Sequence, residues 1–315
     1  MAVEIGSRGK NVVALGGGHG LYATLSALKI LTRNITAVVT VADDGGSSGR
    51  LRKEYDILPP GDLRMALSAL CDDSDWGQTW RDVLQYRFHS EGDLDGHALG
   101  NLLITGLWDL LDDAVVGLDW VGKLLNIRGR VLPMAAVPIT IRAFVEGNDG
   151  APQALVGQVA VAKSHAKILE LAIDPIDPPA QSEAIAAIDA ADWVIFGPGS
   201  WYTSVIPHLL VPRLRDAVCE TRARRALVLN LTPDGETEQM SHADHVYSFL
   251  QHAPNLALDV IVVDGESVDD WHELQQAAHV CGAEILARNV ADDQKPGVHD
   301  ALNLARAFRE MFVRM

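Results

Sequence analysis

Residues 11–20 read Asn-Val-Val-Ala-Leu-Gly-Gly-Gly-His-Gly, an apolar run that is cut short by glycines. The next stretch, 21–31, has helical spacing, and a second β-branched run at 36–41 leads into an Asp-Asp-Gly-Gly turn at 43–46. Strand, glycine turn, helix and strand in this order open a βαβ unit, and strands that alternate with helices imply a parallel sheet. We therefore predict a Rossmann-like three-layer α/β/α fold of the α/β class, with a mainly parallel sheet.

The same pattern returns late in the chain. Apolar runs at 193–196, 227–229 and 260–263 are each followed by helical sequence, and such runs suit central strands that are buried on both faces. A helix is expected around 182–190, just before the first of them. We expect a single domain over 1–315, with its Rossmann-like core at about 10–61 and 181–290.

Two segments interrupt this core. Residues 62–127 read as a helical segment, and seven residues at helical spacing predict one buried helix face there. These are Leu99, Leu102, Leu103, Gly106, Leu107, Leu110 and Leu111. Four β-rich runs at 131–137, 139–145, 156–161 and 168–173 then predict a small antiparallel β insertion over 128–175, with a Gly-Asn-Asp-Gly turn at 147–150.

Composition restricts the function. The 315 residues carry 42 Asp and Glu against 26 Lys and Arg, a formal net charge of −16, which disfavours nucleic acid or anionic lipid as a partner. Cys71, Cys219 and Cys281 lie far apart, as expected in a reducing compartment. We see no secretory signal and no apolar run near the ~20 residues of a membrane span. A cytoplasmic protein without membrane insertion is expected.

The glycine turn is the first candidate site, with Gly16, Gly17, Gly18, His19 and Gly20 between a strand and a helix. Glycines allow close backbone approach, and a helix N-terminus offers free N–H groups to a phosphate. The spacing fits neither the dinucleotide fingerprint nor a P-loop. Nucleotide or phosphate binding is predicted, and a simple tight turn is the alternative.

The second candidate lies at the carboxyl end of the next strand, where ligands of open α/β sheets bind. Its members are Asp43, Asp44, Gly45, Ser47, Ser48 and Arg50. The acids could reach a ribose hydroxyl or hold Mg²⁺, and the serines and the arginine could meet phosphate oxygens. An acidic turn with capping serines is the alternative. Asp62 is expected to cap the following helix, and Arg64 in its first turn needs an anionic partner.

Later motifs supply further candidates. His97 and Asn101 begin the leucine-rich helix, where Asn101 could read a base or sugar or serve packing. A second glycine-rich strand-to-helix loop contains Gly197, Pro198, Gly199, Ser200, Tyr202 and Thr203. Ser200 is its expected cap, and Asn230 follows the next strand at the same edge. Two such loops suggest that the halves of the chain face one crevice.

A zinc site at His242, His245 and His252 with Asp244 is not predicted, because two histidines three residues apart without a third placed ligand are more often surface or cap residues. No GxSxG motif and no nucleophile–base pair supports acyl transfer.

Several ordered motifs resemble one family. They are the glycine turn at 16–20, Val-Thr-Val-Ala-Asp-Asp-Gly-Gly-Ser-Ser-Gly-Arg-Leu-Arg (39–52), Leu-Pro-Pro-Gly-Asp (58–62), Gln-Tyr-Arg-Phe (85–88), Gly-His-Ala-Leu-Gly-Asn-Leu (96–102), Asn-Ile-Arg-Gly-Arg-Val-Leu-Pro (126–133) and Gly-Pro-Gly-Ser-Trp-Tyr-Thr-Ser (197–204). With them the chain resembles, over about 10–310, the gluconeogenesis factor family (YvcK) of the CofD-like superfamily.

The resemblance implies a Rossmann-like core that binds a UDP-sugar, notably UDP-N-acetylglucosamine. It also implies a regulatory rather than catalytic role in cell shape, cell-wall precursor supply and growth on gluconeogenic carbon. The sister CofD branch implies the alternative, a 2-phospho-L-lactate transferase with a nucleotide-diphosphate donor and Mg²⁺. In that case Asp62 and either Asp43 or Asp44 occupy the matching region, and Asp44 and Asp62 are the metal candidates. An NAD-dependent enzyme is a weaker third possibility, because the glycine spacing is wrong for it.

The chain departs from the family pattern at His19, where Thr is usual, and at Trp201, where Leu is usual. Val298-His299-Asp300 lacks the basic residue that some relatives carry there. We expect a homo-oligomer and a regulatory protein partner that the sequence does not name, and no catalytic residue is assigned.

Overall fold

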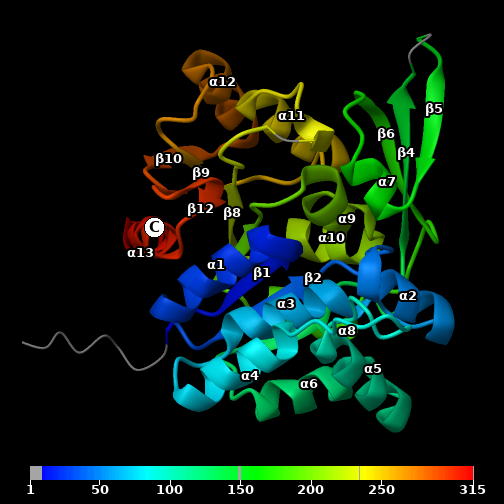
Figure 1. Cartoon of the computed structure of the whole chain (residues 1–315). Helices are drawn as coiled ribbons and strands as arrows, with labels where there is room; N and C mark the ends of the chain where they lie inside the picture. Colours follow the sequence, from blue (N-terminus) through cyan, green and yellow to red (C-terminus); the bar gives the residue numbers. More distant parts are fainter. Residues whose placement is uncertain (1–8, 148–149, 234, 315) are drawn as a thin grey trace, which may run out of the picture.

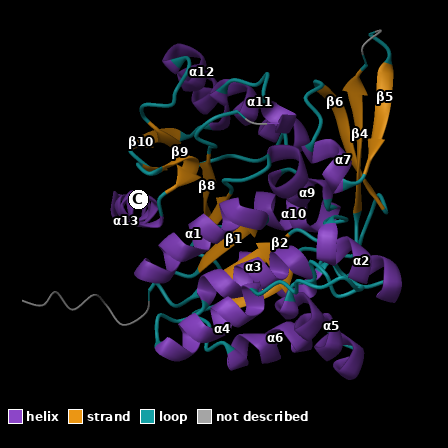
Figure 2. Ribbon diagram, in the orientation of Figure 1, coloured by secondary structure: helices purple, strands orange, loops and turns teal. Residues whose placement is uncertain are grey.

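The computed structural model describes residues 9–147, 150–233 and 235–314, and in them seven strands form a sheet in the order β10-β9-β8-β7-β1-β2-β3. All neighbouring pairs are parallel. The strands are β1 (Val12–Gly16), β2 (Ile35–Val39), β3 (Arg130–Pro133), β7 (Trp193–Phe196), β8 (Arg224–Val228), β9 (Val260–Asp264) and β10 (Glu284–Arg288). The ribbon diagram of Figure 2 shows this sheet among the helices, which confirms the predicted α/β class.

Helices cover the sheet. The N-terminal helix α1 (Gly18–Leu31) packs against α3 (Pro60–Leu70) and against the C-terminal helix α13 (Ala301–Arg314), as Figure 1 shows. A second set includes α8 (Ser182–Asp189), which contacts α10 (Pro212–Glu220), and α11 (His242–His252), which contacts α12 (Trp271–Cys281). From β1 the chain continues to β2 and β3 on one side of the sheet, and from β7 it continues to β8, β9 and β10 on the other side. Right-handed crossovers therefore place the two sets on opposite faces.

The remaining helical elements complete the layers. They are α2 (Gly46–Tyr55), α4 (Asp75–Gln85), α5 (Leu99–Leu111), α6 (Ala114–Leu124), α7 (Gln158–Ala162), α9 (Pro207–Leu210), the π-helix η1 (Trp201–Val205) and the 3₁₀ turn η2 (Gly235–Thr237). In the part of the chain that is described, no helix is both long and apolar enough to span a bilayer.

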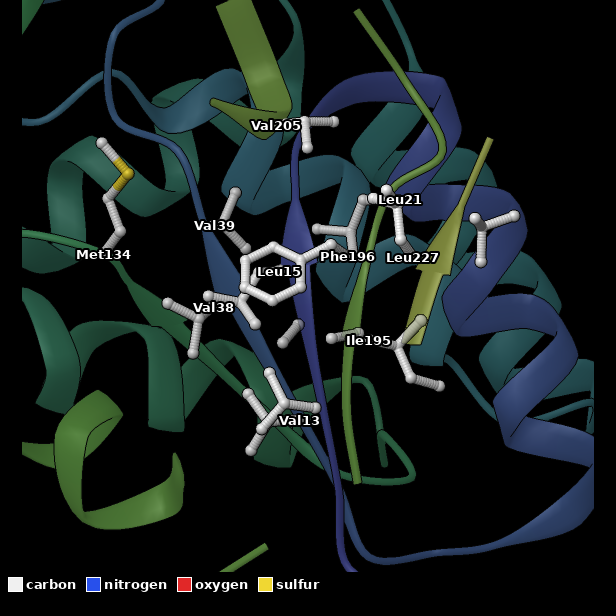
Figure 3. Packing of buried hydrophobic residues seen from close by; sticks show 14 of the residues in the cluster. Val13, Leu15, Leu21, Val38, Val39, Met134, Ile195, Phe196, Val205 and Leu227 are labelled. Carbon is white, nitrogen blue, oxygen red and sulfur yellow. The ribbon is translucent and has the colours of Figure 1, made fainter. Parts of the chain in front are cut away.

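Central strands are buried on both faces, which explains why they read as continuous apolar runs. Every residue of β1, β7 and β9 is buried. Figure 3 shows how Leu15 of β1, Val38 of β2 and Phe196 of β7 pack together in this core. Because both faces of these strands exclude water, the sheet gives a rigid base to the loops at its carboxyl edge.

A three-stranded antiparallel sheet stands apart from the main one, at the right of Figure 1. Its strands are β4 (Thr140–Glu146), β5 (Pro152–Val156) and β6 (Ile168–Asp174), in the order β5-β4-β6. This confirms the predicted insertion, although the expected turn at 147–150 lies partly outside the described residues. A two-stranded hairpin, β11 (Ala291–Asp292) and β12 (Lys295–His299), was not predicted.

Two of the four expected runs are placed differently. The run at 131–137 does not join the insertion, because β3 pairs in parallel with β2 at the edge of the main sheet. In the run at 156–161, only the first residue, Val156, belongs to a strand. Gly157, with a φ of +98°, ends β5, and the chain continues as the short helix α7. Apolar sequence alone does not distinguish these environments.

The predicted buried face of α5 is wrong. The buried side carries Gly100, Asn101, Ile104, Thr105 and Trp108. Leu110 is 76% exposed. The reason is close packing at Gly100, where a Cβ would lie 2.6 Å from Leu84 Cδ2, together with hydrogen bonds of Asn101 to α2 and α3. A count of apolar residues misses both effects.

This orientation predicts that Leu110→Glu leaves the free energy of unfolding within about 0.5 kcal/mol of the parent value, as expected for exposed positions. Urea denaturation measures it, and light scattering on the same samples measures the oligomeric state. A loss of several kcal/mol without a change in mass would contradict the exposed placement.

Candidate functional site

Two glycine-rich loops meet at the carboxyl edge of the sheet. β1 lies between β7 and β2. After β1 the chain continues to β2 on one side, and after β7 it continues to β8 on the other side, so the strand order reverses between β1 and β7. The loops that follow these two strands flank this point. A Cβ on Gly20 would lie 2.1 Å from the carbonyl oxygen of Pro198, so the two loops are in direct contact. In open α/β sheets the ligand crevice lies at this position.

A cavity of about 740 Å³ opens here. Its walls come from the two glycine loops, the start of α3, the insertion helix α7, the loop after β8 with η2, and the β12 strand. The lining residues are Gly17, Gly18, His19, Gly20, Ala23, Asp62, Gln158, Ala162, Pro198, Gly199, Ser200, Trp201, Ser204, Asn230, Leu231, Thr232, Gly235, Glu236, Thr237, Pro296, Gly297, Val298 and His299. This volume lies within the range usual for small-molecule sites.

The structure thus brings nine of the sequence-predicted residues to one cavity. They are Gly17, Gly18, His19, Gly20, Asp62, Pro198, Gly199, Ser200 and Asn230. The amide of Asn230 accepts a hydrogen bond from Gly199 N at 2.9 Å and donates one to Gly199 O at 3.0 Å. It therefore fixes the second glycine loop. Ser200 stands at the N-cap position of η1 but makes no side-chain cap bond.

Four other predicted residues are chain neighbours of residues that line the cavity. Gly16 ends β1, and Gly197 accepts a hydrogen bond from Thr24 Oγ1 through its carbonyl oxygen at 2.8 Å. Tyr202 N donates to Glu236 Oε1 at 2.8 Å, and the Thr203 hydroxyl contacts the same oxygen at 3.4 Å. Tyr202 and Thr203 therefore link η1 to η2, and none of the four residues lines the cavity.

A third group forms a buried polar network between α2, α3 and α5. Asn101 accepts from Arg64 Nε at 2.9 Å and donates to Ser47 Oγ at 3.0 Å and to Ser48 Oγ at 3.5 Å. His97 Nδ1 lies 3.0 Å from Ser47 Oγ. Burial lowers the pKa of the Arg64 guanidinium to about 10. The anionic partner expected for Arg64 is replaced by amide oxygens, because Gln85 Oε1 also accepts from it.

Arg50 lies outside the main cavity. Its guanidinium donates to the carbonyl oxygens of Asp93 at 3.1 Å and of Asp95 at 2.6 Å, which holds the loop before α5. Together with His97 it borders a separate hollow beside α2. A phosphate held by Arg50 would therefore not share the cavity of the glycine loops.

Asp62 carries the main electrostatic feature of the cavity. It lies in the first turn of α3, where Pro59 rather than Asp62 is the N-cap residue. Its Oδ2 atom is enclosed and has no hydrogen-bond partner among the described residues. Burial, with the nearby charge of Asp43, raises the pKa of this carboxyl to about 7, against a hydrogen bond from the Gly18 backbone that lowers it. Near neutral pH the group can donate or accept a proton.

The two adjacent acids after β2 have separate partners. Asp43 Oδ1 accepts from Gly45 N at 2.9 Å within its own turn. Asp44 Oδ1 accepts from Val159 N at 3.0 Å, and a Cβ on Gly157 would lie 2.0 Å from Asp44 Oδ2. Asp44 therefore caps α7, while Asp62 borders the cavity. No group of three or more metal-type side chains is found in the described ranges, so Mg²⁺ ligation by Asp44 and Asp62 stays a prediction.

Sequence analysis names Val298 and His299 only as part of a departure from the family pattern, and it misses Gln158 and the β11–β12 hairpin as walls of the cavity. Burial lowers the pKa of His299 in β12 to about 4, and its Nε2 lies 3.2 Å from Leu229 O. At neutral pH the imidazole is therefore uncharged, and it is fixed against Leu229, the residue that follows β8. Buried Asp264 accepts from Val290 N at 2.8 Å and Ala291 N at 3.1 Å, which holds the hairpin in place. No local sequence signal points to either contribution.

The histidines of α11 each have their own partner. His242 Nδ1 lies 2.9 Å from Asp269 Oδ1, His245 Nδ1 lies 2.7 Å from Ser241 O, and His252 Nδ1 lies 2.8 Å from Ser248 O. These contacts anchor the helix and the loop after β9.

Comparison with known proteins agrees with this architecture. A family model described as "2-phospho-L-lactate transferase CofD" matches residues 12–303. A protein of Mycobacterium tuberculosis described as "Putative gluconeogenesis factor" is 50% identical over 303 residues, covering 93% of this chain and 88% of its own. The "Gluconeogenesis factor" of Bacillus subtilis is 40% identical over 262 residues, covering 82% and 80% of the two chains.

A crystal structure of a upf0052-family protein from Bacillus halodurans superposes with a TM-score of 0.87 at 35% identity, covering 96% of this chain and 100% of that one. Sequence relatives, family model and solved structure all extend over nearly the whole fold. The chain belongs to the gluconeogenesis factor family, whose domain is CofD-like.

Proposed function

We propose that the protein is a cytoplasmic nucleotide-sugar-binding regulator that takes a ligand of the UDP-N-acetylglucosamine type. In this proposal, binding of that ligand in the cavity regulates cell shape, cell-wall precursor supply and growth on gluconeogenic carbon, as expected from the family resemblance. The established part is membership of the gluconeogenesis factor family, and the ligand and the regulated process are the steps beyond it.

One observation carries the ligand proposal. The strand order β8-β7-β1-β2 puts the two contacting glycine loops in the middle of the cavity, with polar walls on both sides. On one side lie Asp62 and Gln158, and on the other lie Asn230, Thr232 and His299. Backbone N–H groups of such loops suit a diphosphate. A diphosphate with one group attached at each end fits this arrangement better than a mononucleotide.

The net charge of −16 agrees with local rather than general anion binding. Exposed apolar residues on α5 and α6, among them Leu110 at 76% and Trp120 at 52%, support self-association or a protein partner at this side of the molecule. We propose a homo-oligomer, with the regulated partner undefined.

We expect isothermal titration with UDP-N-acetylglucosamine and UDP-glucose to give a Kd on the order of micromolar, about −8 kcal/mol. GDP and NADH should bind at least about tenfold more weakly, each measured with and without Mg²⁺. Chromatography of the ligand after several hours should show it unaltered.

Three results would contradict the regulator proposal. Preference for GDP with a strict Mg²⁺ requirement would favour an enzyme, and tighter binding of NADH than of UDP-sugars would remove the ligand assignment. Absence of binding by all four ligands would also count against it.

The description of the matched family model favours a second candidate, a CofD-like 2-phospho-L-lactate transferase. In it, Mg²⁺ held by cavity acids would neutralise the charge on the donor's diphosphate bridge while the phospho-lactyl group is transferred and a nucleoside monophosphate leaves. Asp62 fits this role through its unpartnered Oδ2, whereas Asp44 is engaged by α7. Metal-dependent product formation that Asp62→Asn abolishes would support the transferase over the regulator.

A further inference from the structure

The cavity has two chemically different ends, and they can be assigned to the two ends of a nucleoside diphosphate sugar. This assignment rests on the function proposed above. The end beyond β8 and β12 carries apolar surface from Leu231, Pro296 and Val298. Of the polar side chains at this end, which also include Thr232, Asn230 and His299 are already bonded to Gly199 and to Leu229 O.

The end beyond β2 is different. Gln158 Oε1 and Asp62 Oδ2 are both enclosed, and neither has a hydrogen-bond partner among the residues the structure describes. Both residues line the cavity. Enclosed acceptors without a partner are uncommon in folded proteins, because each one costs free energy until a donor reaches it.

Gln158 is held in place by the chain around it. It is the first residue of α7, whose N-terminus is fixed by Asp44 through the hydrogen bond to Val159 N. α7 also packs against β4, η1 and η2, so it links the antiparallel insertion to the cavity. The backbone at this position is therefore held by contacts from three separate parts of the fold.

We infer that Gln158 is a specificity-determining residue that accepts a hydrogen bond from the sugar of the bound nucleoside diphosphate sugar, while the base lies at the β8–β12 end. A sugar presents several O–H or N–H donors, which match the unpartnered acceptors. A base presents broad apolar faces, which match Leu231, Pro296 and Val298. Asp44 is a positioning residue, since it acts on the ligand only through α7.

The test is titration of Gln158→Met with UDP and with UDP-N-acetylglucosamine. Methionine keeps the approximate length of glutamine and removes the acceptor. One lost hydrogen bond lowers the affinity for the UDP-sugar about tenfold, and the affinity for UDP stays within about twofold. Gln153→Met is the matched control, because Gln153 is exposed on β5 of the same insertion. Both affinities should be unchanged in it.

A second variant tests the other end. Val298→Thr keeps the shape of an exposed valine and replaces one of its methyl groups with a hydroxyl, so it should weaken the binding of UDP and of UDP-N-acetylglucosamine by the same factor of about three. Equal losses for both ligands in Gln158→Met, or a loss confined to the UDP-sugar in Val298→Thr, would reverse the orientation. No change in Gln158→Met would overturn the role of Gln158. Failure of the parent protein to bind either ligand would instead reject the proposed function.

Discussion

Gly20→Ala is expected to lower the free energy of unfolding by about 3 kcal/mol or more, at the upper end for overpacking. The added Cβ would lie 2.1 Å from Pro198 O, 2.5 Å from Pro198 C and 2.6 Å from Gly199 Cα. All three are backbone atoms, so no side-chain rotation relieves the clash. The two glycine loops must separate, and the helix α1 must shift from the second loop.

The affinity of Gly20→Ala for its ligand should fall together with its stability. If separation of the loops removes two backbone hydrogen bonds to the diphosphate, the affinity for the UDP-sugar drops about a hundredfold. Urea denaturation and isothermal titration of the folded variant measure the two effects.

Gly106→Ala is the control for this substitution. Gly106 lies in α5, far from the cavity lining, and a Cβ there meets no atom within 4 Å. The change should stabilise the helix by about 1 kcal/mol and leave the affinity unchanged. If Gly20→Ala behaved like Gly106→Ala, the contact between the two loops would be refuted.

The strands that could be predicted are those whose sequence reflects burial on both faces. β1, β7 and β9 are buried at every position, and each was found from its apolar run. β10 could not be found in this way, because its ends are exposed and only Leu286 is buried. β3 was assigned to the wrong sheet, since pairing with β2 rather than with the insertion depends on contacts distant in sequence.

The candidate site likewise contains parts that could be predicted from the sequence and parts that could not. The glycine loops could be predicted because each one directly follows a buried strand and precedes a helical segment. Gln158 could not be predicted, because its place in the cavity depends on the hydrogen bond from Val159 N of α7 to Asp44, and these two residues are 115 positions apart in the chain. The sequence likewise gives Arg64 and Asn101 as polar candidates without showing that they are hydrogen-bonded to each other.

Asp62→Asn should make the protein more stable above neutral pH. The carboxyl has its ordinary pKa of 3.8 in the unfolded chain and a pKa of about 7 in the folded protein. The folded state therefore binds the proton more tightly, so the parent protein loses stability as pH rises from about 4 to 7. The loss can reach 1.36 kcal/mol per pH unit from this group alone, up to about 4 kcal/mol in total. Asparagine imitates the protonated carboxyl and removes this loss.

Urea denaturation at pH 5 and pH 8 measures the effect. The difference in stability between Asp62→Asn and the parent should grow by about 3 kcal/mol between these two values, in favour of the variant. Asp44→Asn is the control, because Asp44 is exposed and faces α7, so its pH dependence should follow the parent. Parallel pH profiles for Asp62→Asn and the parent would show that the carboxyl is ionised in the folded protein without cost.

Ligand binding gives an independent check of the same carboxyl. Without divalent metal, an ionised Asp62 repels a diphosphate in the cavity, whereas its protonated form does not. The affinity of the parent protein for a UDP-sugar should therefore fall as pH rises through about 7, the folded pKa of this group. In Asp62→Asn the fall should be absent. If Mg²⁺ reverses the trend in the parent and has no effect in the variant, Asp62 holds the metal, because a bound cation turns the ionised carboxylate from a repulsive neighbour into a ligand.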